Sequence, residues 1–278
     1  MPESSGLSKR KESYLRGLAR KSVRARRGRF VAEGPRVVEE ALRGRLRVTE
    51  LVATPSAAGD IDRWRAAGLL DHVEVSTADA RAFRGLAEGV HPQGVLAVVE
   101  EPAERLEDLV PSGPVLVLDR LQDPGNAGTL VRSLQATGGS VVVALSGTVD
   151  LFNAKAVRAS AGSLFHLRVA SRVPAAALLE WLDAHGVPLH VLHPAGEPLF
   201  GPGWSAPGHV ALAVGNEGGG ADPALLRRAA WTLALPMSAG VESLNAGVAG
   251  SVALYELLRR RREGPAEAPA LSREVEPS

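Results

Sequence analysis

Short apolar runs that stop abruptly at polar or glycine-rich loops constrain the fold of this chain more than any other feature of its sequence. Six such runs fall in the C-terminal part, at 115–119, 140–145, 167–170, 188–192, 209–214 and 232–235. Apolar runs of this length predict buried strands, and the longer stretches between them predict helices, the last of which extends from about 243 to 262. Strands that alternate with helices indicate a parallel sheet covered on both faces. The sequence therefore predicts an α/β fold.

The N-terminal part repeats this alternation on a smaller scale. The predicted elements are a basic helix over 8–26, a helix that starts at Pro35, a helix at 61–67, and strands at 29–34, 48–53, 72–75 and 94–100. A proline-containing stretch without periodicity follows. We therefore predict a disordered leader at 1–7, a small α/β domain at 8–101, a linker at 102–113, a second domain at 114–262 and a disordered tail at 263–278.

Composition excludes several classes of function. Hydrophobic residues make up 45% of the 278 residues and aromatic residues only 4%, so the chain can bury a large core that must be aliphatic. The absence of cysteine excludes disulfides, thiolate catalysis, cysteine-ligated zinc and iron–sulfur clusters, and it fits the cytoplasm. No apolar stretch approaches the roughly 20 residues of a membrane helix, and the N-terminus lacks the apolar segment of a secretory signal.

Basic charge is concentrated near the N-terminus, although the whole chain has a net charge of only +1. Between Lys9 and Arg29 the sequence has ten Lys or Arg residues and one acidic residue, Glu12. Such a concentration is typical of a surface that binds a polyanion, and a solvated leader is the alternative. The candidate RNA-binding residues are Lys9, Arg10, Lys11, Arg24, Arg26, Arg27 and Arg29.

Three of the loops carry the candidate site residues. They are 123–132 (DPGNAGTLVR), 214–219 (VGNEGG) and 235–245 (LPMSAGVESLN). Open α/β sheets place their ligand sites at the carboxyl ends of parallel strands, so we expect these loops to meet around one pocket. Their polar side chains suit a sugar hydroxyl and a phosphate better than a metal ion or an acyl group. The candidates are Asn126, Arg132, Glu217, Ser243 and Asn245.

Each loop by itself has an ordinary structural explanation. Asn126 is predicted to cap the helix that contains Arg132, and Ser243 to cap the last helix, whose N–H groups favour an anionic ligand. The glycines of 215–220 allow a close approach of backbone to ligand, but a flexible turn has the same composition. The segment is neither a P-loop nor a dinucleotide fingerprint.

Together the three loops resemble the motifs of the SpoU/TrmH family of RNA ribose 2′-O-methyltransferases, within the SPOUT superfamily. The matching patterns are N-x-G-x-x-x-R at 126–132, G-N-E-G at 215–218, and L-P-M with S-L-N at 235–237 and 243–245. The segment 153–162 resembles the family's intervening helix, and 30–34 and 92–97 resemble its accessory RNA-binding domain. One departure is Asn245-Ala-Gly-Val, where the family often has Asn-Val-Ser-Val. The smaller residues are expected to alter the helix packing or the pocket wall.

The resemblance implies a C-terminal SPOUT domain with a trefoil knot, which forms a homodimer and binds S-adenosyl-L-methionine. Gly215, Leu235, Met237 and Leu244 would contact this cofactor, Asn126 and Glu217 would hold Arg132, and Ser243 and Asn245 would fix the ribose, the cofactor or a phosphate. Arg132 would be the base or a positioning group, and it would complete the site of the other subunit.

The expected function is ribose 2′-O-methylation of structured RNA, with 23S ribosomal RNA ahead of tRNA. No membrane and no metal partner is expected. His190 and His193 disfavour a metal site because they would lie on opposite faces of a strand. The alternatives are a tRNA methyltransferase, a ribosomal RNA methyltransferase that confers antibiotic resistance, and a non-catalytic RNA-binding protein of the same fold.

Overall fold

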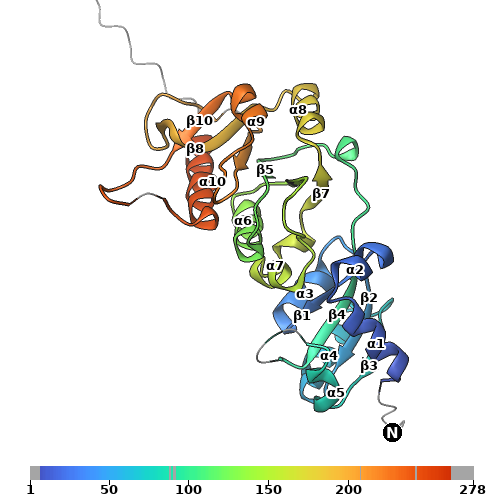
Figure 1. Cartoon of the computed structure of the whole chain (residues 1–278). Helices are drawn as coiled ribbons and strands as arrows, with labels where there is room; N and C mark the ends of the chain where they lie inside the picture. Colours follow the sequence, from blue (N-terminus) through green and yellow to red (C-terminus); the bar gives the residue numbers. More distant parts are fainter. Residues whose placement is uncertain (1–6, 88, 90–91, 207, 242, 264–278) are drawn as a thin grey trace, which may run out of the picture.

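The computed structural model of the protein describes residues 7–87, 89, 92–206, 208–241 and 243–263. The leader expected at 1–7 and the tail expected at 263–278 lie outside the described residues, except for Leu7 and Glu263. Within the described part the strands form two separate sheets, one of four strands and one of six (Figure 1).

The smaller sheet belongs to the N-terminal part. Its strands lie in the order β1-β4-β2-β3, and only the β2–β3 pair is parallel. The strands are β1 (Arg29–Glu33), β2 (Val48–Ala53), β3 (Glu74–Thr77) and β4 (Val95–Glu100). The helices around them are α1 (Lys9–Gly17), α2 (Lys21–Arg27), α3 (Pro35–Arg43), α4 (Ala58–Ala66) and α5 (Ala80–Arg84). An α/β domain was predicted here, and the structure has one.

The prediction of one continuous basic helix over 8–26 is wrong. Ser8 caps α1 by accepting a hydrogen bond from the amide of Lys11, and α1 ends at Gly17. The chain then turns, and α2 begins after Arg20, whose backbone is extended. The turn lets Leu18 enter the core, where it is 1% exposed, and it aims Arg24 of α2 at the C-terminal domain. Leu18 and Arg24 are thus buried on two different sides, which explains why the segment does not form a single helix.

The larger sheet is parallel throughout, in the order β10-β8-β9-β5-β6-β7. Its strands are β5 (Val115–Leu118), β6 (Val141–Leu145), β7 (Arg168–Val173), β8 (Leu189–Pro198), β9 (Ala211–Val214) and β10 (Trp231–Ala234). Every residue of β5, β6 and β9 is buried. The predicted parallel sheet is confirmed, since only strands covered on both faces read as unbroken apolar runs.

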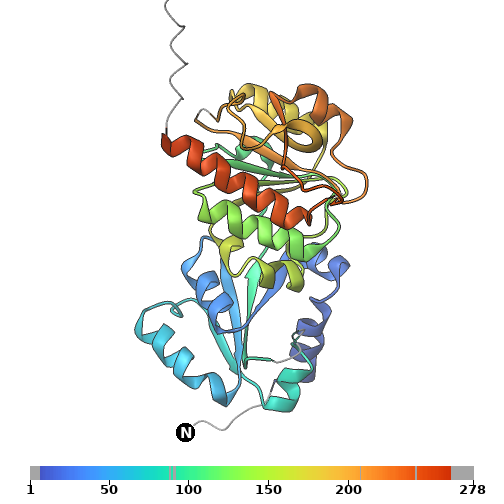
Figure 2. The same ribbon diagram turned by 90° about the vertical axis from the view of Figure 1, so that its left-hand side faces the viewer.

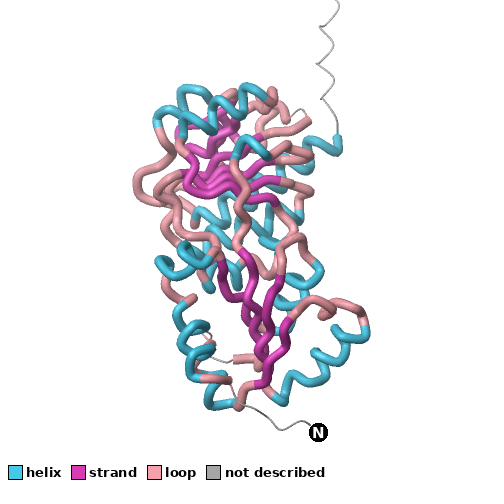
Figure 3. The backbone as a smooth tube through the Cα atoms, turned by 90° about the vertical axis from the view of Figure 1, so that its right-hand side faces the viewer, coloured by secondary structure: helices cyan, strands magenta, loops and turns pink. Residues whose placement is uncertain are grey.

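Helices cover both faces of this sheet. They are α6 (Pro124–Ala136), α7 (Ala154–Ala159), α8 (Ala175–Ala184), α9 (Pro223–Arg228) and α10 (Ala246–Glu263). Figure 2 shows α10 and α6 side by side on the face toward the N-terminal domain, with α7 between α6 and that domain. The other face is covered by α8 and α9, whose apolar side chains form a separate core with the sheet. Figure 3 shows helices and loops between the two sheets.

The strand order places a topological switch between β5 and β9. From β5 the chain continues outward to β6 and β7, and it then returns to the other side of β5 through β8 and β9. Loops that leave neighbouring strands in opposite directions open a crevice at their carboxyl ends, where α/β sheets bind ligands. Two of the three candidate loops follow β5 and β9, so the fold itself places them at this crevice.

Candidate active site

The loops after β5 and β9 are joined by side-chain hydrogen bonds. The Nδ2 of Asn216 donates to the carbonyl of Arg120 at 2.8 Å, and the Nδ2 of Asn126 donates to the Oε1 of Glu217 at 3.0 Å. The amide of Gln122 also donates to the Oε2 of Glu217, at 3.4 Å. Two segments about ninety residues apart therefore form one surface, as the sequence predicted.

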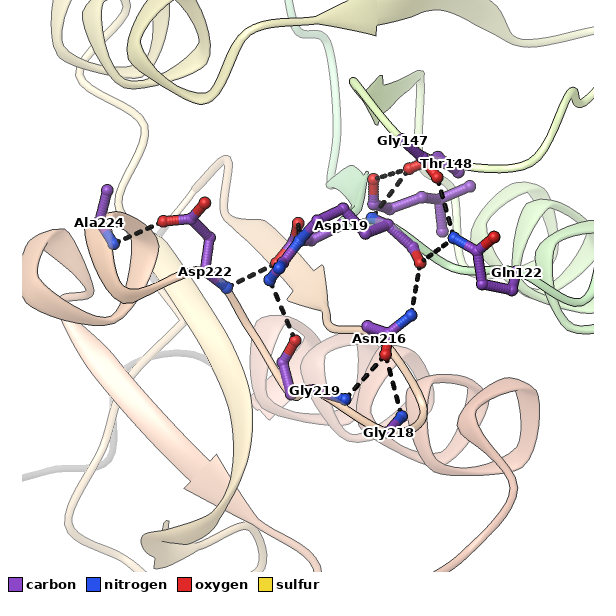
Figure 4. Close-up of polar contacts among 12 residues, drawn as sticks. Asp119, Gln122, Gly147, Thr148, Asn216, Gly218, Gly219, Asp222 and Ala224 are labelled. Atoms are coloured by element: carbon purple, nitrogen blue, oxygen red, sulfur yellow. Dashed lines mark hydrogen bonds and ion pairs between the residues drawn. The ribbon is translucent and has the colours of Figure 1, made fainter.

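The glycine-rich loop after β9 is a built turn. The Oδ1 of Asn216 accepts hydrogen bonds from the amides of Gly218 at 3.0 Å and Gly219 at 2.7 Å, as Figure 4 shows. Gly215 must lack a side chain, because a Cβ there would lie 2.5 Å from the nitrogen of Ala221. These contacts hold the loop in one shape and leave the carboxylate of Glu217 exposed on it.

A buried carboxylate beneath the loops was missed as a site residue by the sequence reasoning. Asp119, at the end of β5, is 1% exposed and accepts the amide of Asp222 at 2.6 Å (Figure 4). It also pairs with the Nε of Arg120 at 2.8 Å, and Arg120 has the left-handed φ of 56°. The available signal was an acidic residue directly after an apolar strand. Asp119 and Arg120 fix the path of the chain into the 123–132 loop.

Asp123, and not Asn126, caps α6, so the predicted cap is corrected. The Oδ1 of Asp123 accepts the amide of Asn126 at 2.9 Å, and its Oδ2 pairs with the Nζ of Lys155 at 2.9 Å. The ion pair with Lys155 and the cap hydrogen bond hold the pKa of Asp123 below its ordinary value. Because Asp123 satisfies the helix end, the amide side chain of Asn126 is free to bind Glu217.

Glu217 is held as a charged carboxylate. Partial burial raises its pKa, but the hydrogen bonds from Asn126 and from backbone amides outweigh burial and lower the pKa below the ordinary value. Within the described residues Arg132 contacts neither Asn126 nor Glu217 and has no hydrogen-bond or ion-pair partner. It is exposed on α6, and six residues of helix place it on a different side from Asn126. A single chain therefore forms the Asn126–Glu217 pair and leaves Arg132 outside it.

The third loop ends at Asn245, which caps α10 in place of the predicted Ser243. The Oδ1 of Asn245 accepts the amide of Val248 at 3.2 Å. A Cβ on Gly247, in the first turn of α10, would lie 3.2 Å from the Cα of Asn126. The start of α10 therefore lies against the start of α6, and this contact brings Asn245 close to Asn126. Ser243 and Leu244 lie exposed on the loop, as does Met237, and Leu235 is half-buried.

The loops offer a suitable surface for a mixed polar and apolar ligand. Leu244 and Met237 expose apolar side chains on a segment that is neither helix nor strand. Gly215 lies in the neighbouring glycine-rich turn. Among the described residues no group of three or more His, Asp or Glu side chains is arranged to hold a metal ion. Nor does any helix in those ranges have the length and apolar character to cross a membrane.

The basic residues of the N-terminal domain divide into two sets. Lys9, Arg10, Arg26 and Arg27 are exposed and, within the described ranges, unpaired. Lys11 pairs with Glu74 at 2.5 Å, and Arg29 lies within 3.6 Å of Glu50.

Arg24 differs from both sets because it is 5% exposed and pairs with Asp150 at 2.6 Å. It has no surface to offer a phosphate, so we assign it to the domain interface. Arg20, which was not among the candidates, is exposed and lines an open hollow of about 560 Å³ beside α1.

Comparison with known proteins identifies the family. Residues 113–255 match the SpoU rRNA Methylase family, and residues 11–97 match the MRM3-like substrate binding domain. The chain belongs to the SpoU rRNA methylase family. The resemblance drawn from the three motifs is thus confirmed.

Related proteins of this family cover nearly the whole chain. The 23S rRNA (guanosine(2553)-2′-O)-methyltransferase RlmP of Bacillus subtilis is 34% identical over 239 residues, which are 85% of this chain and 91% of that protein. The 23S rRNA (uridine(2479)-2′-O)-methyltransferase of Streptomyces viridochromogenes is 30% identical over 260 residues, 89% and 88% of the two chains.

Solved structures agree with these relatives. The SpoU methyltransferase AviRb from Streptomyces viridochromogenes, in complex with the cofactor AdoMet, has a TM-score of 0.80 at 27% identity and covers 93% of this chain and 100% of its own. An AdoMet-bound rRNA methyltransferase from Sinorhizobium meliloti has a TM-score of 0.78 at 28% identity, with 89% and 94% covered. The expected SPOUT methyltransferase fold is confirmed by these neighbours.

The small residues that depart from the SpoU pattern have a structural reason. Gly247, within the departing segment 245–248, is buried against Asn126. One turn later and outside the segment, a Cβ on Gly250 would lie 2.3 Å from a methyl group of Leu130 on α6. Small residues at these positions let α10 and α6 approach closely. The departure therefore acts on helix packing beside the site and removes none of the candidate reacting groups.

Proposed function

We propose that this protein transfers a methyl group from S-adenosyl-L-methionine to a ribose 2′-hydroxyl of structured RNA, and that 23S ribosomal RNA is the substrate. The observation that carries the proposal is the meeting of three family motifs at one sheet edge, where Asn126 binds Glu217 and lies against the start of α10. The activities for which the two relatives are named support the choice of RNA. A cytoplasmic location follows from a ribosomal substrate and belongs to the same proposal.

The cofactor would be held by the loops after β9 and β10. These loops present backbone groups and apolar side chains at Gly215, Leu235, Met237 and Leu244. Backbone groups can form hydrogen bonds with the edge of the adenine ring, and apolar side chains can pack on its face. When bound, S-adenosyl-L-methionine supplies an electrophilic methyl group. The site needs no metal ligands for this reaction. The trefoil knot expected around these loops remains part of the proposal.

The polar residues would activate and orient the ribose. A hydroxyl is a weak nucleophile at its own pKa, so it must be placed accurately and lose its proton during attack. An arginine side chain stays protonated in proteins, so Arg132 suits the placement of a phosphate better than the removal of a proton. Ser243 and Asn245 would bind the ribose or the adjacent phosphate, and the Asn126–Glu217 pair fixes the wall of the site beside them.

A homodimer would bring Arg132 to a second site. Val248, Val252 and Tyr255 follow one another at four- and three-residue spacing on α10 and form an apolar stripe, with Val248 48% and Tyr255 53% exposed. The helix that carries Arg132 packs beside α10, where the hydroxyls of Ser133 and Ser251 lie 2.7 Å apart. A second copy that covers the stripe would meet Arg132, which the structure leaves without a partner in its described part.

The experiment is methyl transfer from labelled S-adenosyl-L-methionine to ribosomal RNA and, separately, to bulk tRNA, both from a strain that lacks the gene. Nuclease digestion and mass spectrometry would map the product. A 2′-O-methyl nucleotide at one ribosomal position supports the proposal, and its position separates a housekeeping enzyme from a resistance enzyme. Label in tRNA alone would overturn the substrate, and absence of both transfer and cofactor binding would favour a non-catalytic RNA-binding protein.

A variant tests the role of Arg132 in the same assay. We expect Arg132→Ala to lose methyl transfer and keep cofactor binding, which calorimetry would measure. Arg65→Ala is the matched control, since Arg65 is exposed on α4 and, among the residues that the structure describes, pairs only with Asp62 at 3.2 Å. Full methylation by Arg132→Ala would remove Arg132 from the mechanism.

A further inference from the structure

One buried ion pair joins the two domains at a point that the proposed mechanism does not use. The Nη2 and Nε of Arg24 donate to the Oδ2 of Asp150 at 2.6 and 3.2 Å. The Nη1 of Arg24 donates to the carbonyls of Leu18 and Ala19 at 2.9 and 2.6 Å. The side chains of Arg24 and Asp150 are only 6% and 17% exposed. Almost every donor of the guanidinium is thus committed within the protein.

Asp150 lies at the start of a segment that leads directly into α7. Its Oδ1 accepts the amide of Phe152 at 2.9 Å, and its carbonyl accepts a hydrogen bond from the side chain of Asn153. The Oδ1 of Asn153 then caps α7 by accepting the amide of Ala156 at 3.0 Å. The ion pair therefore holds the turn from which α7 starts.

Helix α7 is packed against α6 without spare room. A Cβ on Gly128 of α6 would lie 2.5 Å from the carbonyl oxygen of Ala156 and 2.6 Å from the Cβ of Ala159. Gly128 is two residues from Asn126, which binds Glu217. A shift of α7 must therefore move the first turn of α6, because the two backbones are already in contact.

Aromatic side chains seal the same junction. Phe152 packs on Phe30 of β1 with ring centroids 5.0 Å apart, and Phe165 stacks on Phe30 at 6.1 Å. All three rings are at most 3% exposed. The aromatic rings therefore hold the turn at 150–153 against β1, and the ion pair joins the same turn to α2.

We propose that Arg24 is a positioning residue for methyl transfer. Its ion pair with Asp150 fixes the start of α7 relative to the N-terminal domain. Because α7 packs against α6, the pair thereby also fixes the first turn of α6, where Asn126 holds Glu217. The inference rests on the proposed methyl transfer and adds that the RNA-binding domain sets the geometry of the reacting site as well as the affinity for RNA.

The alternative role, a direct contact to RNA, has a different signature. Loss of a phosphate contact weakens RNA binding and reduces its salt dependence, and it does not depend on Asp150. Loss of a positioning contact lowers kcat at saturating RNA, because a displacement of about 1 Å can slow a reaction by roughly a hundredfold. Removal of either partner then has the same effect. Coupling between two residues is established by a double-mutant cycle.

The experiment compares Arg24→Gln, Asp150→Asn and the double variant in the full-length protein. We expect kcat for ribosomal RNA to fall roughly tenfold or more in each single variant. The double variant should be no slower than the singles, and affinity for S-adenosyl-L-methionine should be unchanged. Arg26→Gln is the contrast: Arg26 is exposed on the same helix, so its loss should raise KM for RNA and leave kcat alone.

Folding is controlled by measuring the melting temperature of every variant and assaying well below it. Removal of one partner of a buried ion pair is strongly destabilising. Arg24→Gln is at greater risk because it also removes the hydrogen bonds to the carbonyls of Leu18 and Ala19, so the nearly isosteric Asp150→Asn carries the test if Arg24→Gln does not fold.

A wild-type kcat in folded Asp150→Asn overturns the inference, as do additive losses in the double variant or a parallel loss of cofactor affinity. If the wild-type protein itself methylates no RNA, the proposed function has failed instead.

Discussion

Replacement of Gly128 by alanine tests how closely α6 must pack against α7. The added Cβ would lie 2.5 Å from the carbonyl oxygen of Ala156, 2.6 Å from the Cβ of Ala159 and 2.9 Å from the amide nitrogen of Ser160. Two of these atoms are backbone, so no side-chain rotation relieves the overlap. Ordinary contact begins at 3.4 Å, and the two helices must therefore separate by about 0.9 Å.

The expected loss of stability combines two opposing effects. Overpacking of a filled core destabilises by roughly 1–3 kcal/mol. Alanine inside a helix is more favourable than glycine by about 1 kcal/mol. The net loss for Gly128→Ala is therefore about 0–2 kcal/mol, which corresponds to a melting temperature lower by up to roughly 8 °C for a domain of this size.

The same separation should also reduce activity. Asn126 is two residues from Gly128, and its Nδ2 lies 3.0 Å from the Oε1 of Glu217. An increase of nearly 1 Å takes this pair beyond hydrogen-bonding distance. We expect methyl transfer to fall roughly tenfold or more, as for other misplacements of about 1 Å in active sites.

Thermal unfolding and the labelled-methyl assay would measure both effects. Gly59→Ala is the control, since Gly59 lies in α4 with no atom within 4 Å of the added Cβ. It should be neutral or stabilising by up to about 1 kcal/mol. A Gly128→Ala protein that is as stable and as active as the wild type would refute the tight coupling of α6 to α7.

Two further predictions concern single polar groups. Glu217→Gln keeps the shape of the side chain but replaces a charged acceptor for Asn126 by a neutral one. We expect this variant to weaken that hydrogen bond by about 1 kcal/mol and to lower kcat about fivefold, while its affinity for the cofactor stays unchanged. A kcat equal to that of the wild type would exclude a role for the charge.

His190 is 1% exposed, and its Nδ1 has no partner within the described structure. Burial lowers the pKa of His190 to about 4, although the hydrogen bond to the carbonyl of Ser205 opposes this shift in part. The unfolded chain takes up a proton near pH 6.5 and the folded one only near pH 4, so the free energy of unfolding should fall by about 3 kcal/mol between these pH values. Urea unfolding at pH 7.5 and 5 would show about 2 kcal/mol of this loss in the wild type and a smaller loss in His190→Gln. Identical pH profiles of the two proteins would contradict the assignment.

The strands of the C-terminal domain were predictable because both of their faces are buried. The runs at 115–119, 140–145 and 209–214 match β5, β6 and β9 to within two residues. The run at 188–192 did not reveal the full length of β8, which extends to Pro198. This extension depends on pairing with β10 after a shift of register, and such a contact leaves no apolar pattern in the sequence.

The helix caps were only partly predictable. Asn126 and Asp123 are both good capping residues, as are Ser243 and Asn245, and local propensity does not distinguish within either pair. The structure uses Asp123 and Asn245. The side chain of Asn126 instead donates a hydrogen bond to Glu217, which lies in the loop after β9. The choice of cap was thus decided by which loops meet at the sheet edge.

The sequence by itself determined the parallel sheet, the order of the three loops and the residues that they carry. Apolar periodicity and glycine position act over a few residues, so they can be read along the chain. The partners of charged groups were decided only by the tertiary structure. Arg24 looks like any other residue of a basic segment, yet it is buried on Asp150, 126 residues away, while Arg26 stays in solvent. A charge can be buried only where an opposite charge meets it, and that meeting depends on how the two domains pack.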